Sequence, residues 1–431
     1  MKKFIAFACV LAVCAGAAFA GGGAGDRGMR FGWWGNPLRN AMTAQVLDLF
    51  TQQHDIQMDE FQSPWGEYWG HMATQAMART MPDVMQHDVS WILQHQTDGL
   101  LVNLTPFINN GTIRTQHIPD TVLAQGRIDG RVYAIPIGMN FSANVYNATL
   151  LESLGLSAPR HMTLDQFVAV SREVYQRTGV RTNIAFGDNP GNQLTAILRG
   201  RGISEMITPN GLGGAVADYL VFFQLIEQGI QEGWHIRPEH MAGREGVGQD
   251  PLIFPASMAT RADANLRSWN AFVWSNMISA LQDAAPAGTR LSMTTYPSAN
   301  PQQSHFGRAS MFLAITRDAS NTANAAKFVD FWLNTPAVGA ITRTERGIPS
   351  NTAVAGAIGP LLSPLEQMQI EYVNWSNQPG NSAPFSPLLP AGHAEVTAEL
   401  RVVSEMVAAG QLTAQAAATR FFTNGNNFLR R

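Results

Sequence analysis

The sequence predicts an α/β protein built as two lobes, each a mixed sheet flanked by helices. Its 431 residues are enough for two domains of ordinary size, each with its own core. Short β-type runs alternate with helical patterns along the N-terminal third. Two extended, proline-marked stretches, residues 133–146 and 291–297, interrupt this alternation and fit segments that cross between lobes.

The first twenty residues have the three parts of an export signal. Lys2 and Lys3 form the basic start, residues 4–13 form the apolar run, and a small-x-small pattern ends at Ala20. The apolar run is shorter than the ~20 residues of a membrane anchor, so we expect cleavage after Ala20. A rival interpretation is lipidation at Cys14, which Val13 disfavours. Either way the protein is predicted to be periplasmic or extracellular.

The mature chain is predicted to contain no cysteine, because Cys9 and Cys14 both lie in this segment. Disulfides, thiolate metal sites and a cysteine nucleophile are therefore not expected. No later stretch is long and apolar enough to span a membrane.

The N-terminal elements follow the alternation in order. Residues 29–34 predict a strand, and a helix follows with apolar residues at helical spacing, namely Leu38, Met42, Val46, Leu49 and Phe50. Strands are predicted at 56–61 and 83–87, with a helix between them that Pro82 ends. Strands that alternate with helices favour a largely parallel sheet covered on both faces.

The later part of the chain is richer in helices. Thr163 and Gln166 form a capping box at the start of one helix, and residues 216–230 read as another. A strand is predicted within 306–316. Asn321 is expected to cap an amphipathic helix whose apolar residues recur from 325 to 333, and a last helix is predicted at 395–409.

Composition and motifs argue against several function classes. Only 14% of residues are charged and the formal net charge is -3, whereas nucleic-acid binding needs a basic face. The chain lacks the G-x-S-x-G, H-E-x-x-H and G-x-x-x-x-G-K motifs. His87 and His95 are eight apart without a supporting carboxylate pattern, so neither a metal nor a cofactor is expected. A glycosidase-type carboxylate pair stays open, since 32 acidic residues offer many pairs.

Five segments, in order, resemble one known family. They are Tyr68-Trp69 with Pro82-Asp83-Val84, then residues 129–136 (DGRVYAIP), Tyr146-Asn147 with 151–156 and 163–167, residues 325–333, and Gly347-Ile348-Pro349. Together they resemble the extracellular solute-binding proteins of ABC importers, in the sugar-binding branch that includes maltose-binding protein. Residues 200–290 match poorly, and this region helps to shape the ligand site.

The resemblance implies the two-lobed periplasmic-binding-protein-like fold of type II, joined by hinge crossings. After the signal peptide at 1–20, we expect residues 27–139 and 292–345 to form the first lobe. Residues 140–291 and 346–431 then form the second lobe.

The residue types suit a sugar, which has apolar C–H faces and a rim of hydroxyls. Its receptor needs flat aromatic rings together with side chains that both donate and accept hydrogen bonds. Ten tryptophans and few charges fit this ligand better than an ionic one. Such groups belong at strand ends that face the region between two lobes.

Candidate ligand residues in the first lobe lie at predicted strand ends. They are Trp34, Asn36, Trp65 and Trp91. The family resemblance implies two more, Asp88 after the third predicted strand and Asn140 on the first crossing. Each has a structural alternative: core packing for the tryptophans, helix capping for Asn36 and Asp88. Trp69 continues a helical stripe and is expected in the core.

In the second lobe the candidates are Arg261, Trp269, Trp274 and Trp375. Trp269 and Trp274 cannot share one helical face, so one of them is expected in the core. Trp375 is placed in a polar, proline-rich loop at 374–390, where it either caps the ligand or packs on the adjacent surface.

The favoured hypothesis is a non-catalytic monomeric receptor that closes its lobes on a sugar and docks on the membrane subunits of an ABC permease. Two alternatives stay open: an exported carbohydrate-active hydrolase, and a binding protein for another solute such as a polyol, glycerol phosphate or a peptide.

Overall fold

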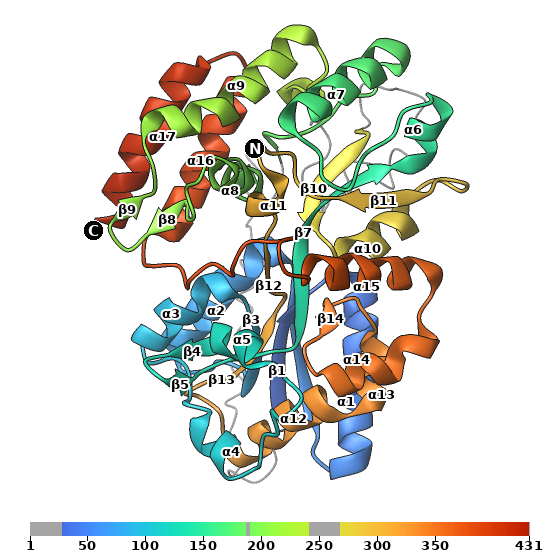
Figure 1. The fold of residues 1–431 in the computed structure, drawn as a ribbon. Helices are drawn as coiled ribbons and strands as arrows, with labels where there is room; N and C mark the ends of the chain where they lie inside the picture. The colour runs from blue at the N-terminus through green and yellow to red at the C-terminus, as the bar shows by residue number, and fades with distance from the viewer. Residues whose placement is uncertain (1–27, 187–189, 241–267, 431) are drawn as a thin grey trace, which may run out of the picture.

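The computed structural model describes residues 28–186, 190–240 and 268–430 and has the predicted two-lobed α/β architecture. One lobe contains the N-terminal strands, and the other contains α6 to α9 with the C-terminal helices α16 and α17 (Figure 1). The export signal at 1–20 and the lipidation alternative at Cys14 lie outside the described residues.

The first lobe is built on a five-stranded sheet of order β2-β1-β3-β13-β6. Its strands β1 (Met29–Trp34), β2 (Met58–Ser63) and β3 (Val84–His87) are parallel, as predicted. They are joined by β13 (Phe312–Ile315) and β6 (Ile135–Pro136), with β13 antiparallel to both of its neighbours. The sheet is therefore mixed, because a strand that returns late in the chain is inserted between β3 and β6.

Helices cover this sheet and share one hydrophobic core with it. They are α1 (Pro37–His54), α2 (Trp65–Ala78), α3 (Val89–Thr97), α4 (Thr105–Asn109), α5 (Asp120–Leu123), α12 (Thr322–Asn334), α13 (Pro336–Thr342) and α14 (Thr352–Ile358). Asn321 caps α12 as expected, accepting from the Asn324 N–H at 3.0 Å. A small hairpin of β4 (Arg127–Ile128) and β5 (Arg131–Val132) follows α5.

One long strand, β7 (Gly138–Asn147), carries the chain from one lobe to the other (Figure 1). Its first half pairs with β12 (Gly307–Ala309) and β14 (Ile348–Pro349). Its second half pairs with β10 (Asn270–Trp274) and β11 (Leu291–Thr294) in the second lobe. The extended stretch predicted at 133–146 contains β6 and most of β7, and the stretch predicted at 291–297 begins with β11.

The second lobe is mainly helical and has its own core. Its helices are α6 (Ala148–Ser153), α7 (Leu164–Thr178), α8 (Pro190–Gly200), α9 (Val216–Glu232), α16 (His393–Ala408) and α17 (Ala414–Leu429). The predicted capping box of Thr163 and Gln166 starts α7. The 200–214 segment contains a short hairpin of β8 (Ile207–Thr208) and β9 (Gly211–Leu212).

A third, smaller cluster lies around β7, where α10 (Met277–Ala284) and α15 (Pro364–Ser376) pack together. The short α11 (Pro301–Ser304) lies against α8. In contrast, α14 packs on α13, and α13 packs on α1. These contacts favour a lobe boundary after α14 rather than at residue 346, and we propose that later position. Within the described ranges, the search for helices long and apolar enough to cross a membrane finds none.

Candidate functional site

The site begins where three parallel strands end. Trp34 is the last residue of β1, Trp65 is the first residue of α2 after β2, and Asp88 follows β3. Because β1 pairs in parallel with both β2 and β3, these three positions meet at one edge of the sheet. Three of the predicted candidates therefore lie at one edge of the sheet, and their contact with a ligand stays a prediction.

Four indoles form a continuous group at this edge, which we call the tryptophan cluster: Trp34, Trp65, Trp69 and Trp91. The Trp69 ring centroid lies 5.2 Å from that of Trp91, nearly parallel, and 5.8 Å from that of Trp65, edge to face. Trp34 lies 5.0 Å from Trp65 but is only 3% exposed, so it supports the cluster from beneath. The prediction for Trp69 was incomplete: the ring packs on the first core and also joins the rings of this cluster.

Two buried histidines lie behind the cluster. Nε2 of His87 is 2.9 Å from Nδ1 of His95, and both rings contact Trp69. Burial lowers the pKa of His95 to about 4, and burial together with His95 lowers the pKa of His87. Both rings are therefore neutral near pH 7 and hold each other in a fixed orientation.

Asp88 connects the cluster to the second lobe. One carboxylate oxygen accepts the Ser90 N–H at 2.9 Å, which caps α3, so the predicted structural alternative for this residue holds. The other oxygen is 3.3 Å from Nη2 of Arg308 on β12. The Arg308 guanidinium carbon lies 4.2 Å from the ring centroid of Trp274, at the end of β10. Asp88, Arg308 and Trp274 thus form a bridge from one lobe to the other.

Three N–H donors in this region have no hydrogen-bond acceptor among the described residues. They are Nε1 of Trp69, Nε1 of Trp274 and Nε of Arg308, all of them buried. A buried donor without an acceptor is costly and calls for an explanation.

Asn36 and Asn140 have structural partners. Asn36 caps α1 by accepting the Arg39 N–H at 2.9 Å, which is its predicted alternative. The Asn140 amide donates to Oδ1 of Asn276 at 2.8 Å, and its oxygen accepts from Ser275 at 3.4 Å. Because its amide and its oxygen both have protein partners, we assign Asn140 to a buried network between the lobes, which we call the hinge network, and its contact with a ligand stays a prediction.

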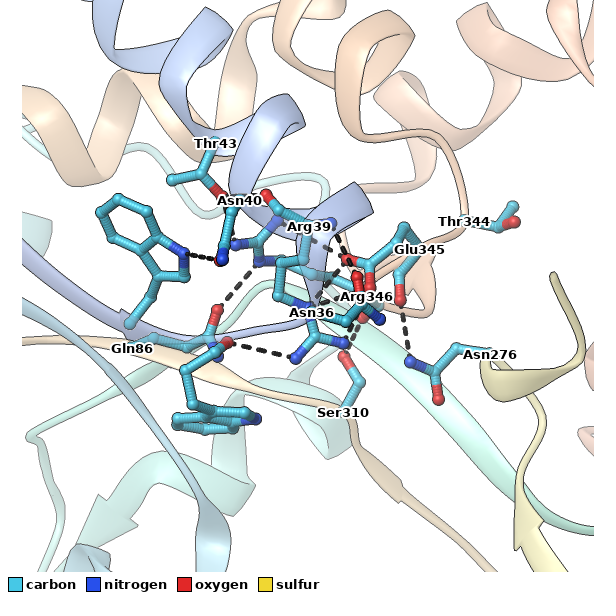
Figure 2. A network of polar contacts seen from close by, with 12 residues as sticks. Asn36, Arg39, Asn40, Thr43, Gln86, Asn276, Ser310, Thr344, Glu345 and Arg346 are labelled. Atoms are coloured by element: carbon cyan, nitrogen blue, oxygen red, sulfur yellow. Dashed lines mark hydrogen bonds and ion pairs between the residues drawn. The ribbon is translucent and has the colours of Figure 1, made fainter. Parts of the chain in front are cut away.

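The hinge network is a buried set of charges around the segment that precedes β14 (Figure 2). Arg39 from α1 donates from Nε to both carboxylate oxygens of Glu345 at 2.9 Å. Nη1 of Arg346 lies 3.7 Å from Oε2 of Glu345. Arg346 donates from Nε to Gln86 at 2.9 Å and from Nη2 to Thr43 at 2.6 Å. The Asn276 amide donates to the Glu345 carbonyl at 2.8 Å, so the network ties both lobes to one segment.

The ionic states in this network follow from competing effects. Burial alone raises the pKa of Glu345, but the charges of Arg39 and Arg346 outweigh burial and hold that pKa below its usual value. Burial lowers the pKa of Arg346 to about 9, so its guanidinium is still cationic at neutral pH. The network is therefore ionised, with two cations around one carboxylate.

The remaining candidates lie apart from the tryptophan cluster. Trp269 is fully buried in the second core, 5.6 Å from Phe167, which argues against the ligand contact predicted for it. Trp269 precedes β10 and Trp274 ends it, so this segment is a strand and not a helix. The expectation that one of them is core holds for Trp269, but Trp274 is also buried, at 9% exposure in a small cluster with Tyr296 and Phe306. Arg261 lies outside the described residues.

Trp375 belongs to the last turn of α15 and not to the loop in which it was placed. Its ring lies 4.9 Å from that of His161, and the Arg160 guanidinium lies 5.0 Å from its centroid. Its ring also lies against Tyr372 and His305, so among the described residues the alternative of packing on the adjacent surface describes Trp375 better than capping the ligand.

A strap, residues 381–390 between α15 and α16, crosses the junction of the lobes (Figure 1). Arg199 of α8 donates to the Pro384 carbonyl at 3.2 Å and to Oγ of Ser386 at 2.8 Å. Phe385 and Leu388 pack on the first core. A cavity of about 290 Å³ lies between the strap and the segment around Val89 and residues 121–127. The strap is thus fastened to one lobe and rests on the other.

Sequence reasoning missed Arg308, and it placed the loop at 374–390 without predicting that residues 381–390 contact both lobes. Arg308 is in a short strand without a motif, and no local pattern indicates that Asp88 would meet it 220 positions later. Among the described residues no group of His, Cys, Asp and Glu could hold a metal ion.

Comparison with known proteins gives one family. The family model described as "Bacterial extracellular solute-binding protein" matches residues 45–360. A periplasmic oligogalacturonide-binding protein from Yersinia enterocolitica, in complex with saturated digalacturonic acid, has a similar structure (TM-score 0.78, 19% identity, 94% of this chain and 99% of that chain).

Two further solved structures are similar. One is the ABC substrate-binding protein Lmo0181 from Listeria monocytogenes with cycloalternan (TM-score 0.75, 14% identity, 93% and 98% covered). The other is the GacH receptor of Streptomyces glaucescens, studied without ligand and with acarbose (TM-score 0.72, 18% identity, 94% and 99% covered). At these identities the likeness shows the fold. Because the family model spans well over half of the chain, the protein belongs to the bacterial extracellular solute-binding proteins.

Proposed function

We propose that the protein is the receptor of an ABC importer and captures a sugar or oligosaccharide between its two lobes by hinge closure. The observation that carries the proposal is the tryptophan cluster beside the Asp88–Arg308–Trp274 bridge, with its three buried donors that lack acceptors. Indole faces suit the C–H faces of pyranose rings, and the free donors suit hydroxyl oxygens. The saccharides bound by the similar Yersinia, Listeria and Streptomyces proteins support this class of ligand.

The hinge is proposed to be β7 with its partners β12 and β14. A ligand that contacts both lobes stabilises only the closed form, and it shifts the population toward that form by its differential affinity. The closed receptor is proposed to dock as an exported monomer on the membrane subunits of a permease. Export through the 1–20 signal is part of the same proposal.

Calorimetry with a panel of mono- and oligosaccharides, paired with small-angle scattering, tests the proposal. We expect at least one saccharide to bind and to reduce the radius of gyration. Mass spectrometry of the denatured protein should identify any solute that copurifies. Absence of binding and of compaction across the panel contradicts the receptor function.

The protein is also proposed to leave its ligand unchanged. Asp88 is the carboxylate of the bridge, and its two oxygens have fixed roles, one capping α3 through Ser90 and the other pairing with Arg308. A glycosidase needs two carboxyl groups, one to protonate the leaving oxygen and one to attack or activate water. Incubation with the bound saccharide should give no new products by chromatography, and product formation contradicts this part of the proposal.

A further inference from the structure

We propose that the Asp88–Arg308 ion pair makes the receptor select neutral saccharides over uronates of the same size, with Asp88 as the residue that rejects a carboxylate. This inference rests on the proposed function and specifies the chemical class of its ligand. It separates this chain from a receptor for acidic sugars, although both kinds share the fold.

The opposite charges of Asp88 and Arg308 cancel where the two side chains meet. Asp88 contributes one negative charge with a side chain that is only 3% exposed, and Arg308 contributes one positive charge at 26% exposure. His393 of α16, whose ring lies 5.2 Å from that of Trp91, has a pKa lowered chiefly by burial. His87 and His95 are neutral for the same reason. The ion pair and the three neutral rings therefore contribute no net charge where Asp88 meets Arg308.

Arg308 is the group that would attract a uronate, since a guanidinium pairs well with a carboxylate. Its Nη2 is already engaged by Asp88 at 3.3 Å, and its stem and guanidinium are fixed by the Trp274 ring. A second carboxylate that approaches Arg308 meets the Asp88 charge in a partly buried setting, where like charges repel strongly. A neutral hydroxyl meets no such repulsion, because it can accept from Nε of Arg308 and donate to Asp88.

The residue Asp88 cannot move away from this position without loss elsewhere. Its second oxygen caps α3 by accepting the Ser90 N–H, and the helix N-terminus favours a negative group there. Asparagine caps a helix about as well as aspartate. The change Asp88→Asn therefore removes the charge, keeps the cap and leaves Arg308 without its counterion, which makes it a clean test.

The test measures calorimetric affinities for matched pairs: neutral galacto- and gluco-oligosaccharides and their galacturonide and glucuronide counterparts. Wild type is expected to bind a neutral member at least about tenfold more tightly than its uronate. Asp88→Asn should narrow or reverse that ratio by about tenfold or more. Asp98→Asn, at the opposite end of α3, should leave it unchanged. Arg308→Gln should weaken the neutral saccharide without any gain for the uronate.

The outcomes separate this inference from the proposed function. Binding of a uronate by wild type as tightly as its neutral counterpart overturns the inference and leaves the receptor function standing. The same holds if Asp88→Asn changes both affinities equally, provided that its thermal unfolding matches that of wild type. Failure of every saccharide to bind contradicts both.

Discussion

Removing the Glu345 charge should destabilise the protein far more than removing an exposed carboxylate. Glu345 is 7% exposed and lies between Arg39 and Arg346, which are 1% and 3% exposed. The change Glu345→Gln leaves two buried guanidinium groups without a counterion. Breaking a buried ion pair on one side typically costs about 3–5 kcal/mol, a large part of a total stability of about 5–15 kcal/mol. We expect the midpoint temperature of the first thermal unfolding transition to fall by on the order of 10 °C.

The pH dependence gives a second signature. The pKa of folded Glu345 lies below its usual value of 4.5, because Arg39 and Arg346 outweigh the effect of burial. A carboxyl with a lowered folded pKa contributes stability that is present above pH 4.5 and is lost as the pH falls through the folded value. Wild type should therefore lose stability in that acidic window, and the Glu345→Gln variant should show a shallower dependence there.

Calorimetric and urea unfolding at pH 7 and below pH 4.5 measure both effects. Glu152→Gln is the matched control, since Glu152 pairs with Arg290 at the surface and the two side chains are 62% and 59% exposed. Such a surface pair contributes at most about 1 kcal/mol. Equal losses in the two variants refute the argument that the buried charge balance stabilises the hinge.

Three further predictions concern the site and the junction. Trp91→Ala should weaken saccharide binding by about tenfold, measured by calorimetry, whereas Trp375→Ala should leave it unchanged; equal effects contradict the placement of the site. Wild-type stability should fall as the pH drops from 6.5 toward about 4, because the unfolded chain protonates His95 in that window while burial keeps the folded ring neutral. His95→Gln should flatten that slope in urea unfolding, and an unchanged slope contradicts the role of His95. Phe385→Ser should loosen the strap from the first core and raise the radius of gyration of the sugar-free protein, whereas identical scattering argues against the strap.

The sequence predicted the elements of the first lobe well because their signals are local. The strand at 29–34 was placed to the residue, and the strands near 56–61 and 83–87 to within two. The buried face of helix α1 was predicted less well. Leu38 and Met42 are only partly buried, while the polar Arg39 and Thr43 face inward. A hydrophobic pattern cannot reveal this, since the partners of these polar side chains, Glu345 and Arg346, lie some 300 residues away.

The grouping of several candidate residues was predictable for the same reason, while their contact with a ligand stays a prediction. Trp34, Trp65, Asp88 and Trp91 follow strand ends, and parallel strands bring their carboxyl ends to one edge. Position alone could not show that the Asn140 side chain bonds to Asn276 in the hinge network. Residue type alone was also insufficient: a tryptophan suits a sugar, but Trp269 is 0% exposed and lies in the core.

The proposed hinge and the candidate site share strand β12, which carries Arg308. Because of this shared strand, closure and recognition would occur together. Arg308 stands opposite Asn140 in the register of β12 and β7. The Asn140 amide donates to Asn276, and the Asn276 amide donates to the Glu345 carbonyl. Arg39, which pairs with Glu345, donates from Nη1 to the Trp34 carbonyl at 3.3 Å, at the base of the tryptophan cluster. On the proposed hinge, a rotation about β7 is expected to shift Arg308 relative to Asp88 while the buried charges keep Trp34 fixed to the first lobe. A solute that contacted Arg308 and the indoles at once, as proposed, would favour one angle of the hinge over all others.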